Sequence, residues 1–238
     1  MNSKDIDFGN LPVYVIHVLG NDERYDFIKN QSEKLGSRNI NVIGDVTPET
    51  IKDFSIFSKY SDLSVLSDGR DQGNACCTLS HRLVHERAKQ NGDEYFLILE
   101  DDFKILDSFD DWKLKAKEKS FDFDIMPMGG YSGWYNDSVW YENMDDEEIL
   151  IVKQVTCSVA TLYTKKGSNQ FIEMFDKVFN IENYEGADGF HHKYVFSSVV
   201  NKSLFPLPIK THASISQITH APADHESYYN EYFKTRSH

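Results

Sequence analysis

The chain has 238 residues, 40% of them hydrophobic and 13% aromatic, which supplies a sizeable core and argues against a disordered protein. The net charge of −13 argues against general attraction to phosphate backbones, so we do not expect a nucleic-acid partner. The chain shows no membrane-span run, no signal-peptide layout and no disulfide or C-x-x-C pattern, so we expect a soluble, cytoplasmic protein.

The first part of the chain has the pattern of a β-α-β unit. Residues 11–19 form a nearly continuous apolar run, as in a strand buried on both faces. Residues 21–36 are typical of a helix, which Gly36 can end. A second strand is predicted at 40–46. This order indicates a parallel α/β sheet flanked by helices.

A second helix and strand lead to a cluster of acids. Residues 73–92 predict a helix, and the strand that starts near residue 94 ends in three consecutive acids, Glu100, Asp101 and Asp102. Ligands of open α/β sheets bind outside the carboxyl ends of the strands. The predicted helix has one apolar face, made by Ala75, Cys76, Leu79, Leu83 and Val84.

Three adjacent carboxylates repel one another unless a cation neutralises them. Oxygen ligands with open positions suit Mg²⁺ or Mn²⁺, ions that also hold substrate phosphates. A solvated acidic turn is the alternative, and the tripeptide alone does not decide between the two.

The segment around the acids resembles the signature of glycosyltransferase family 25, which includes bacterial lipooligosaccharide galactosyltransferases and collagen galactosyltransferases. Its pattern is roughly G-x-x-G-C-x-x-S-H, a helix, and an apolar strand ending in E-D-D. Cys76 stands where the family usually has glycine. The matching residues are Gly73, Cys77, Ser80, His81, Glu100, Asp101 and Asp102.

Shorter segments resemble the family in the same order, over about residues 12 to 216. His17 replaces the usual asparagine, and Thr161 replaces a tyrosine. The matching residues are Arg24, Asp124, Gly129, Ala160, Gly167, Asp188, Phe190, Thr211 and His212.

The resemblance implies one GT-A-type domain over residues 1–238, a Rossmann-like mixed α/β sheet flanked by helices. It also implies a nucleotide-sugar donor, a divalent cation (Mn²⁺ or Mg²⁺) and inversion at the anomeric carbon. UDP-hexose is our first choice of donor, and a glycan or hydroxylated residue supplies the acceptor hydroxyl. Glu100 and Asp102 would bind the metal, since residues two apart on a strand face the same side.

Late residues complete the expected site. His212 would be a further metal ligand, with His220 as the alternative. Asp188 would be the base that takes the proton from the acceptor hydroxyl, and Glu185 is a second carboxylate in the same segment.

The resemblance also implies residues that bind the donor. Asp101 would face its ribose or sugar, and His81 would donate hydrogen bonds to it or to the acidic loop. His85, one turn after His81, is expected to point away and not to bind metal. The full set of expected substrate-binding residues is Arg24, Ser80, His81, Asp101, Gly129 and Trp134.

Trp134 belongs to an aromatic segment, residues 131–141, that suits a sugar-stacking loop or simply packs against the sheet. Two other functions remain open: a metal-dependent nucleotide-sugar phosphohydrolase, and a non-catalytic carbohydrate-binding relative. The departures at His17, Cys76 and Thr161 are the argument for the second.

Overall fold

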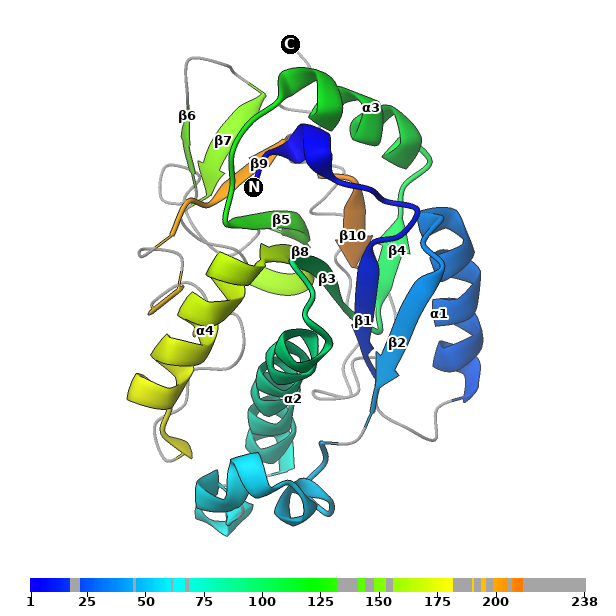
Figure 1. The fold of residues 1–238 in the computed structure, drawn as a ribbon. Coiled ribbons are helices and arrows are strands. Elements are labelled where there is room, and N and C mark those ends of the chain that lie inside the picture. The colour runs from blue at the N-terminus through cyan, green and yellow to red at the C-terminus, as the bar shows by residue number, and fades with distance from the viewer. Residues whose placement is uncertain are drawn as a thin grey trace.

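The computed structural model contains a mixed α/β sheet flanked by helices, as predicted (Figure 1). It describes residues 1–17, 22–44, 46–60, 62–66, 69–131, 141–143, 148–152, 156–181, 190, 194–195, 199–204 and 207–211.

Within these residues a seven-stranded sheet has the order β2-β1-β3-β8-β5-β10-β4. β1 is parallel to β2 and β3, β8 is antiparallel to β3 and β5, and β10 is parallel to β5 and antiparallel to β4. A smaller sheet has the order β6-β7-β9. The strands are β1 (Pro12–Ile16), β2 (Asn39–Ile43), β3 (Tyr95–Glu100), β4 (Phe103–Ile105), β5 (Ile125–Tyr131), β6 (Tyr141–Asn143), β7 (Ile149–Val152), β8 (Thr156–Thr164), β9 (Lys202–Leu204) and β10 (Ile209–Thr211).

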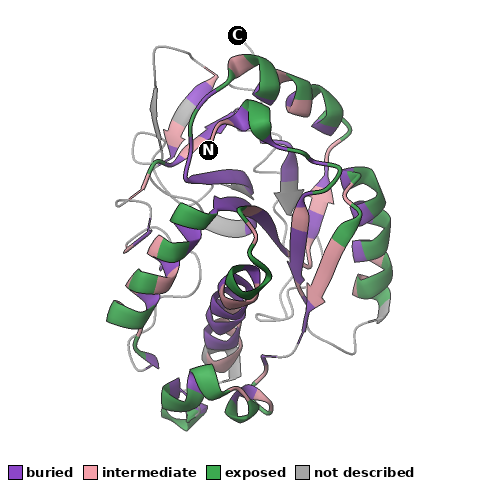
Figure 2. Ribbon diagram, in the orientation of Figure 1, coloured by how far each residue is buried: buried purple, intermediate pink, exposed green. Residues whose placement is uncertain are grey.

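Helices cover both faces of the large sheet. α2 and α4 pack on one face, where they bury strand residues such as Tyr14, and α1 and α3 pack on the other, over Val13 and Val15. Buried residues accordingly gather along α2 and the central strands (Figure 2). The helices are α1 (Asp22–Leu35), α2 (Gly69–Asn91), α3 (Phe109–Lys119) and α4 (Lys165–Val178), with short 3₁₀ turns at Ser3–Asp5, Ile51–Asp53, Ser55–Tyr60 and Leu63–Val65.

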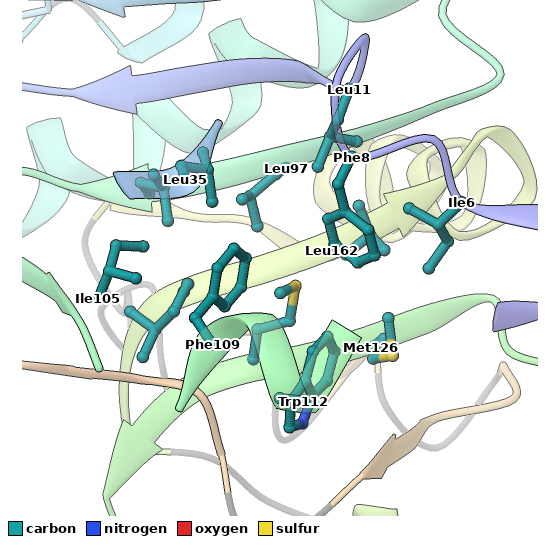
Figure 3. Close-up of a cluster of buried hydrophobic side chains, with 14 of the residues drawn as sticks. Ile6, Phe8, Leu11, Leu35, Leu97, Ile105, Phe109, Trp112, Met126 and Leu162 are labelled. Atoms are coloured by element: carbon teal, nitrogen blue, oxygen red, sulfur yellow. The ribbon is translucent and has the colours of Figure 1, made fainter. Parts of the chain in front are cut away.

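The cluster beneath α1 and α3 is rich in aromatic side chains. Phe109 and Trp112 of α3 pack with Leu97, Met126 and Leu162 of the sheet (Figure 3). Trp112 also donates its indole N–H to the Leu204 carbonyl at 3.0 Å, which ties α3 to β9.

The predicted first half of the chain matches the structure closely. α1 ends at Leu35 and α2 at Asn91, and the next glycines, Gly36 and Gly92, have φ angles of 77° and 76°. Such left-handed backbone after a helix favours glycine. α2 starts at Gly69, before the expected residue 73, and its predicted apolar face is buried in the core. Among the described helices, none is long and apolar enough to cross a membrane.

Two family-matching residues join α4 to β5. The carbonyl of Asp124 accepts hydrogen bonds from the Thr164 backbone N–H at 2.9 Å and its hydroxyl at 3.1 Å. A Cβ atom on Gly167 would lie 2.4 Å from the same carbonyl oxygen. Gly167 therefore permits the close approach of α4 to the sheet, a structural reason for glycine there.

Candidate active site

The acidic tripeptide lies at the carboxyl ends of two neighbouring parallel strands. Ile16, which ends β1, is the register partner of Glu100, which ends β3. From β1 the chain passes through α1 to β2 on one side, while β3 lies on the other side. This is a topological switch point, where open α/β sheets bind their ligands.

Asp101 has two nitrogen partners. Nδ1 of His17, just after β1, lies 2.9 Å from Oδ2 of Asp101, and the Arg24 guanidinium pairs with Oδ1. His17 and Arg24 are 2% and 12% exposed, so both contacts are shielded from water. Arg24 and Asp101, each expected to bind the donor, thus bind one another, and His17 joins them.

Glu100 faces α2. Nε2 of His81 lies 3.2 Å from its Oε1, and the Cys77 Sγ lies 4.0 Å from the same oxygen. Cys77 and His81 are one helical turn apart and share a face of α2. His81 is 1% exposed, so the histidine of the predicted S-H motif contacts the acidic loop, one of its two expected partners.

Asp102 is the carboxylate with the least protein compensation. Its Oδ1 atom is buried and accepts no hydrogen bond from any residue that the structure describes. Burial, together with the Glu100 and Asp101 carboxylates, raises the pKa of Asp102 to about 8, although Arg24 opposes this. A bound cation would offset both causes of this shift, and oxygen donors of this kind suit Mg²⁺ or Mn²⁺.

The end of the described chain approaches the same loop. Phe103, directly after Asp102, is the register partner of Thr211, which ends β10. His212 follows Thr211 in the sequence. The other late or aromatic residues expected in the site, like His212 itself, lie outside the described residues: Trp134, Glu185, Asp188 and His220.

A model of "Glycosyltransferase family 25 (LPS biosynthesis protein)" matches residues 10–185. The chain belongs to glycosyltransferase family 25. As a family member it is a glycosyltransferase, with a sugar donor and an acceptor. A search of curated protein sequences finds no significant match.

A solved structure supports the fold of this family member. It is a glycosyltransferase involved in the glycosylation of the major capsid of PBCV-1, with a TM-score of 0.50 and 10% identity, over 89% of this chain and 96% of that one. The inositol-1-phosphate CTP transferase from T. maritima has a TM-score of 0.46 and 14% identity, over 84% of this chain and 86% of that one.

The three departures from the family pattern have different settings. Cys76 is 4% exposed and packs in the core under α2, and Thr161 is 2% exposed in β8, opposite Ile98. Neither side chain is part of the acidic site. His17 is part of it, because its ring bonds Asp101 in the position where the family usually has asparagine.

Two residues expected to bind the donor have structural partners. The Ser80 hydroxyl donates to the Cys76 carbonyl at 2.8 Å, inside α2. Gly129 lies in the interior of the sheet, where a Cβ would come within 2.8 Å of Val159 and 3.0 Å of Ala160. Both residues therefore have contacts within the protein, and their donor-binding role stays a prediction.

His85 belongs to the core between α2 and α4. Its Nδ1 lies 2.9 Å from the Ser168 hydroxyl, and its ring stacks on Phe171 at 4.0 Å between centroids. Although it follows His81 by one turn, it points into this aromatic cluster.

Sequence reasoning missed two contacts of the acids, that of His17 with Asp101 and that of Cys77 with Glu100. The signal for His17 was its place at the end of a strand parallel to β3. The signal for Cys77 was its four-residue spacing from His81 on a predicted helix.

Proposed function

We propose that this family 25 protein is a metal-dependent, inverting glycosyltransferase of the GT-A type. It moves a hexose from a nucleotide-sugar, with UDP-hexose as first choice, to a hydroxyl group of a glycan or hydroxylated residue. The observation that carries the proposal is the buried Oδ1 of Asp102, which has no hydrogen-bond partner among the described residues at the switch point of the sheet.

Asp102 and Glu100 would hold Mn²⁺ or Mg²⁺, with His212 as a further ligand. The register of β10 with β4 supports His212 as a ligand. Thr211, the residue before His212, is the partner of Phe103, the residue after Asp102. When bound, such an ion neutralises the charge that develops on a diphosphate leaving group.

Asp101 is suited to orient the donor. Its pairing with Arg24 and His17 fixes the carboxylate, and each oxygen keeps a lone pair for a ribose or sugar hydroxyl. A carboxylate held by two partners loses little conformational freedom when the donor binds, which favours a defined donor orientation.

Single-step inversion requires a base on the acceptor side, and we assign this role to Asp188. The Asp188 carboxylate takes the proton from the acceptor hydroxyl while the hydroxyl oxygen attacks the anomeric carbon and the sugar–phosphate bond breaks. The Asp188→Asn variant should lose roughly a hundredfold or more in turnover but keep its donor affinity. Equal losses of both would make Asp188 a donor or metal ligand instead.

Thermal unfolding with nucleoside diphosphates tests the metal-dependent donor site. UDP at about 100 times its dissociation constant should stabilise the wild type by about 2.7 kcal/mol when Mn²⁺ is present. The shift should vanish in Asp102→Asn and persist in Asp107→Asn, whose carboxylate is fully exposed. An equal shift without Mn²⁺, or an unchanged shift in Asp102→Asn, would rule out this metal site.

Product analysis separates transfer from hydrolysis. A phosphohydrolase releases free sugar or phosphate at the same rate with or without an acceptor. A transferase consumes donor rapidly only when an acceptor hydroxyl is supplied.

The ligand role of His212 has its own test. Imidazole binds metal only when neutral, so Mn²⁺ affinity in the presence of UDP should weaken between about pH 7 and pH 5.5. His212→Ala should start weaker and respond less to pH. The diphosphate titrates in both proteins, so superimposable curves would transfer the role to His220 or water.

A further inference from the structure

A second group of metal-binding atoms lies beside Asp102 and has a different chemistry. The Cys77 Sγ, a ring nitrogen of His81 and a carboxylate oxygen of Glu100 all lie within 4.8 Å of one another. We propose that these three side chains form a site for Zn²⁺ or a similar thiophilic divalent cation.

The separations are close to those of a metal site. Tetrahedral Zn²⁺ has bonds of about 2.3 Å to sulfur and about 2.0–2.2 Å to nitrogen and oxygen, which places neighbouring ligand atoms about 3.3–3.6 Å apart. The His81 Nε2 lies 3.2 Å from the Glu100 Oε1, and the Cys77 Sγ lies 4.0 Å from it. Small side-chain rotations would bring all three atoms around one ion.

The elements that carry the ligands are well anchored. Cys77 and His81 lie one turn apart in the long helix α2, whose opposite face is packed in the core. Glu100 ends β3, a central strand whose preceding residues, 96–99, are buried. His85, the next histidine on α2, is hydrogen-bonded to Ser168 and is not a candidate ligand. The described residues therefore supply three ligands, which leaves a fourth position for water or a substrate atom.

The donor set selects the metal. Thiolate and imidazole favour Zn²⁺ and Co²⁺ over Mn²⁺ and Mg²⁺, which prefer oxygen. The Cys77 thiolate and the Glu100 carboxylate together balance the charge of a divalent ion. We expect affinity to fall in the order Zn²⁺, Co²⁺, Mn²⁺.

Glu100 is shared by both sites, and this gives the second site a consequence that rests on the proposed function. When Zn²⁺ binds Glu100 together with Cys77, it withdraws a carboxylate from the Mn²⁺ site next to Asp102. Zn²⁺ should therefore inhibit transfer in competition with Mn²⁺.

Co²⁺ binding to the full chain tests the site without donor or acceptor, so the result is independent of transferase activity. The wild type should show a thiolate-to-cobalt charge-transfer band in the near ultraviolet, which one equivalent of Zn²⁺ abolishes. Cys77→Ser should lose the band, while Cys76→Ser, which removes the adjacent thiol in the core, should keep it. A band that persists in Cys77→Ser, or its absence from the wild type, would overturn the proposal.

Calorimetric titration with Zn²⁺ measures how much each ligand contributes to the affinity. Loss of the Cys77 thiolate should weaken binding by more than the roughly 10–100-fold that follows loss of an outer-shell partner. Glu100→Gln should also weaken it.

Alkylation of the wild type covers the case in which a variant misfolds. Zn²⁺ should slow iodoacetamide modification of Cys77, located by mass spectrometry, and a chelator should restore it. Unchanged labelling of Cys77 at saturating Zn²⁺ would contradict the assignment.

Discussion

Glu100, Asp101 and Asp102 are consecutive, yet their carboxylates meet three different environments. Glu100 contacts His81, and Asp101 is held by Arg24 and His17. Asp102 has a buried oxygen that receives no hydrogen bond within the described part of the chain. Without a cation this arrangement opposes folding, because the buried carboxyl group must either keep an uncompensated charge or bind a proton.

Replacing Asp102 should stabilise the metal-free protein at the expense of metal binding. Burial and the neighbouring acids raise the pKa of Asp102 from 3.8 to about 8. Between these values the folded state holds a proton that the unfolded state releases, so the free energy of unfolding falls as pH rises. Asp102→Asn does not titrate, so its advantage over the wild type should grow from pH 5 to pH 8, by at most about 1.4 kcal/mol per pH unit.

Thermal unfolding in the presence of a chelator measures this difference. Asp107→Asn is the matched control, because its carboxylate is exposed to solvent. Melting temperatures of Asp102→Asn and wild type that run parallel from pH 5 to pH 8 would show that Asp102 is ionised in the folded state throughout.

His17→Asn should be tolerated although it changes a site residue. Histidine Nδ1 and asparagine Nδ2 are both two bonds from Cβ, so either can donate to Oδ2 of Asp101. His17→Leu removes the donor and should lower the free energy of unfolding by about 1.5–3 kcal/mol, the range for a hydrogen bond to a charged group. Urea unfolding compares the variants, and an unchanged free energy of unfolding in His17→Leu would mean that Asp101 does not need this bond.

At the scale of elements, the contact between α4 and β5 depends on a missing side chain. Gly167→Ala would place Cβ 2.4 Å from the Asp124 carbonyl oxygen, so the helix must move. We expect a loss of about 1–3 kcal/mol, the usual result of overpacking. For a protein of this size each kcal/mol lowers the melting temperature by about 2–4 °C.

Gly9→Ala is the control for this substitution. Its Cβ would meet only the Asp7 carboxylate, at an ordinary 3.4 Å. Equal melting temperatures for the two alanine variants would show that α4 can shift without loss of packing.

Elements with local signals were predictable, and those defined by pairing were not. Gly36 and Gly92 marked the ends of α1 and α2, and the apolar run before Glu100 marked β3. β8 runs antiparallel between β3 and β5, and no local sequence pattern predicts which strands it pairs with. β4 and β10 have three residues each, too few to show the alternation of a strand.

The site was predictable to the same degree. Three acids after a buried strand indicated a ligand position, because the strand end is a local feature. The partners of the acids come from β1, α1 and α2, so pairs such as Arg24 with Asp101 depend on tertiary packing. Family resemblance named Ser80 and Gly129 for the donor, and the structure shows that each also has internal contacts, which the sequence did not reveal.

On the scale of the whole molecule, β10 is an interior strand drawn from the end of the described chain. It lies between β5 and β4, and its Ile209 is fully buried. A chain that ends at Thr211 keeps this strand, whereas one that ends at Leu204 loses it together with the buried Leu207. Each such side chain contributes about 1.5–3 kcal/mol.

We therefore expect the chain ending at Thr211 to unfold cooperatively and the chain ending at Leu204 to melt lower and aggregate through its exposed strand edges. Circular dichroism melting and sedimentation test this pair. Identical melting curves would mean that β10 adds nothing to the stability of the sheet.

The pairing of β4 with β10 also bears on protein synthesis. Ile105 and Ile209 are register partners although a long stretch of chain separates them, so the loop between them must close before this edge of the sheet forms. During translation β1, α1, β2, α2 and β3 leave the ribosome before β10, so the three carboxylates emerge well before the strand that will lie beside them. A nascent chain of that length presents the acids and the Cys77 thiol without β10, so the surroundings of the acids are completed only after β10 has been synthesised.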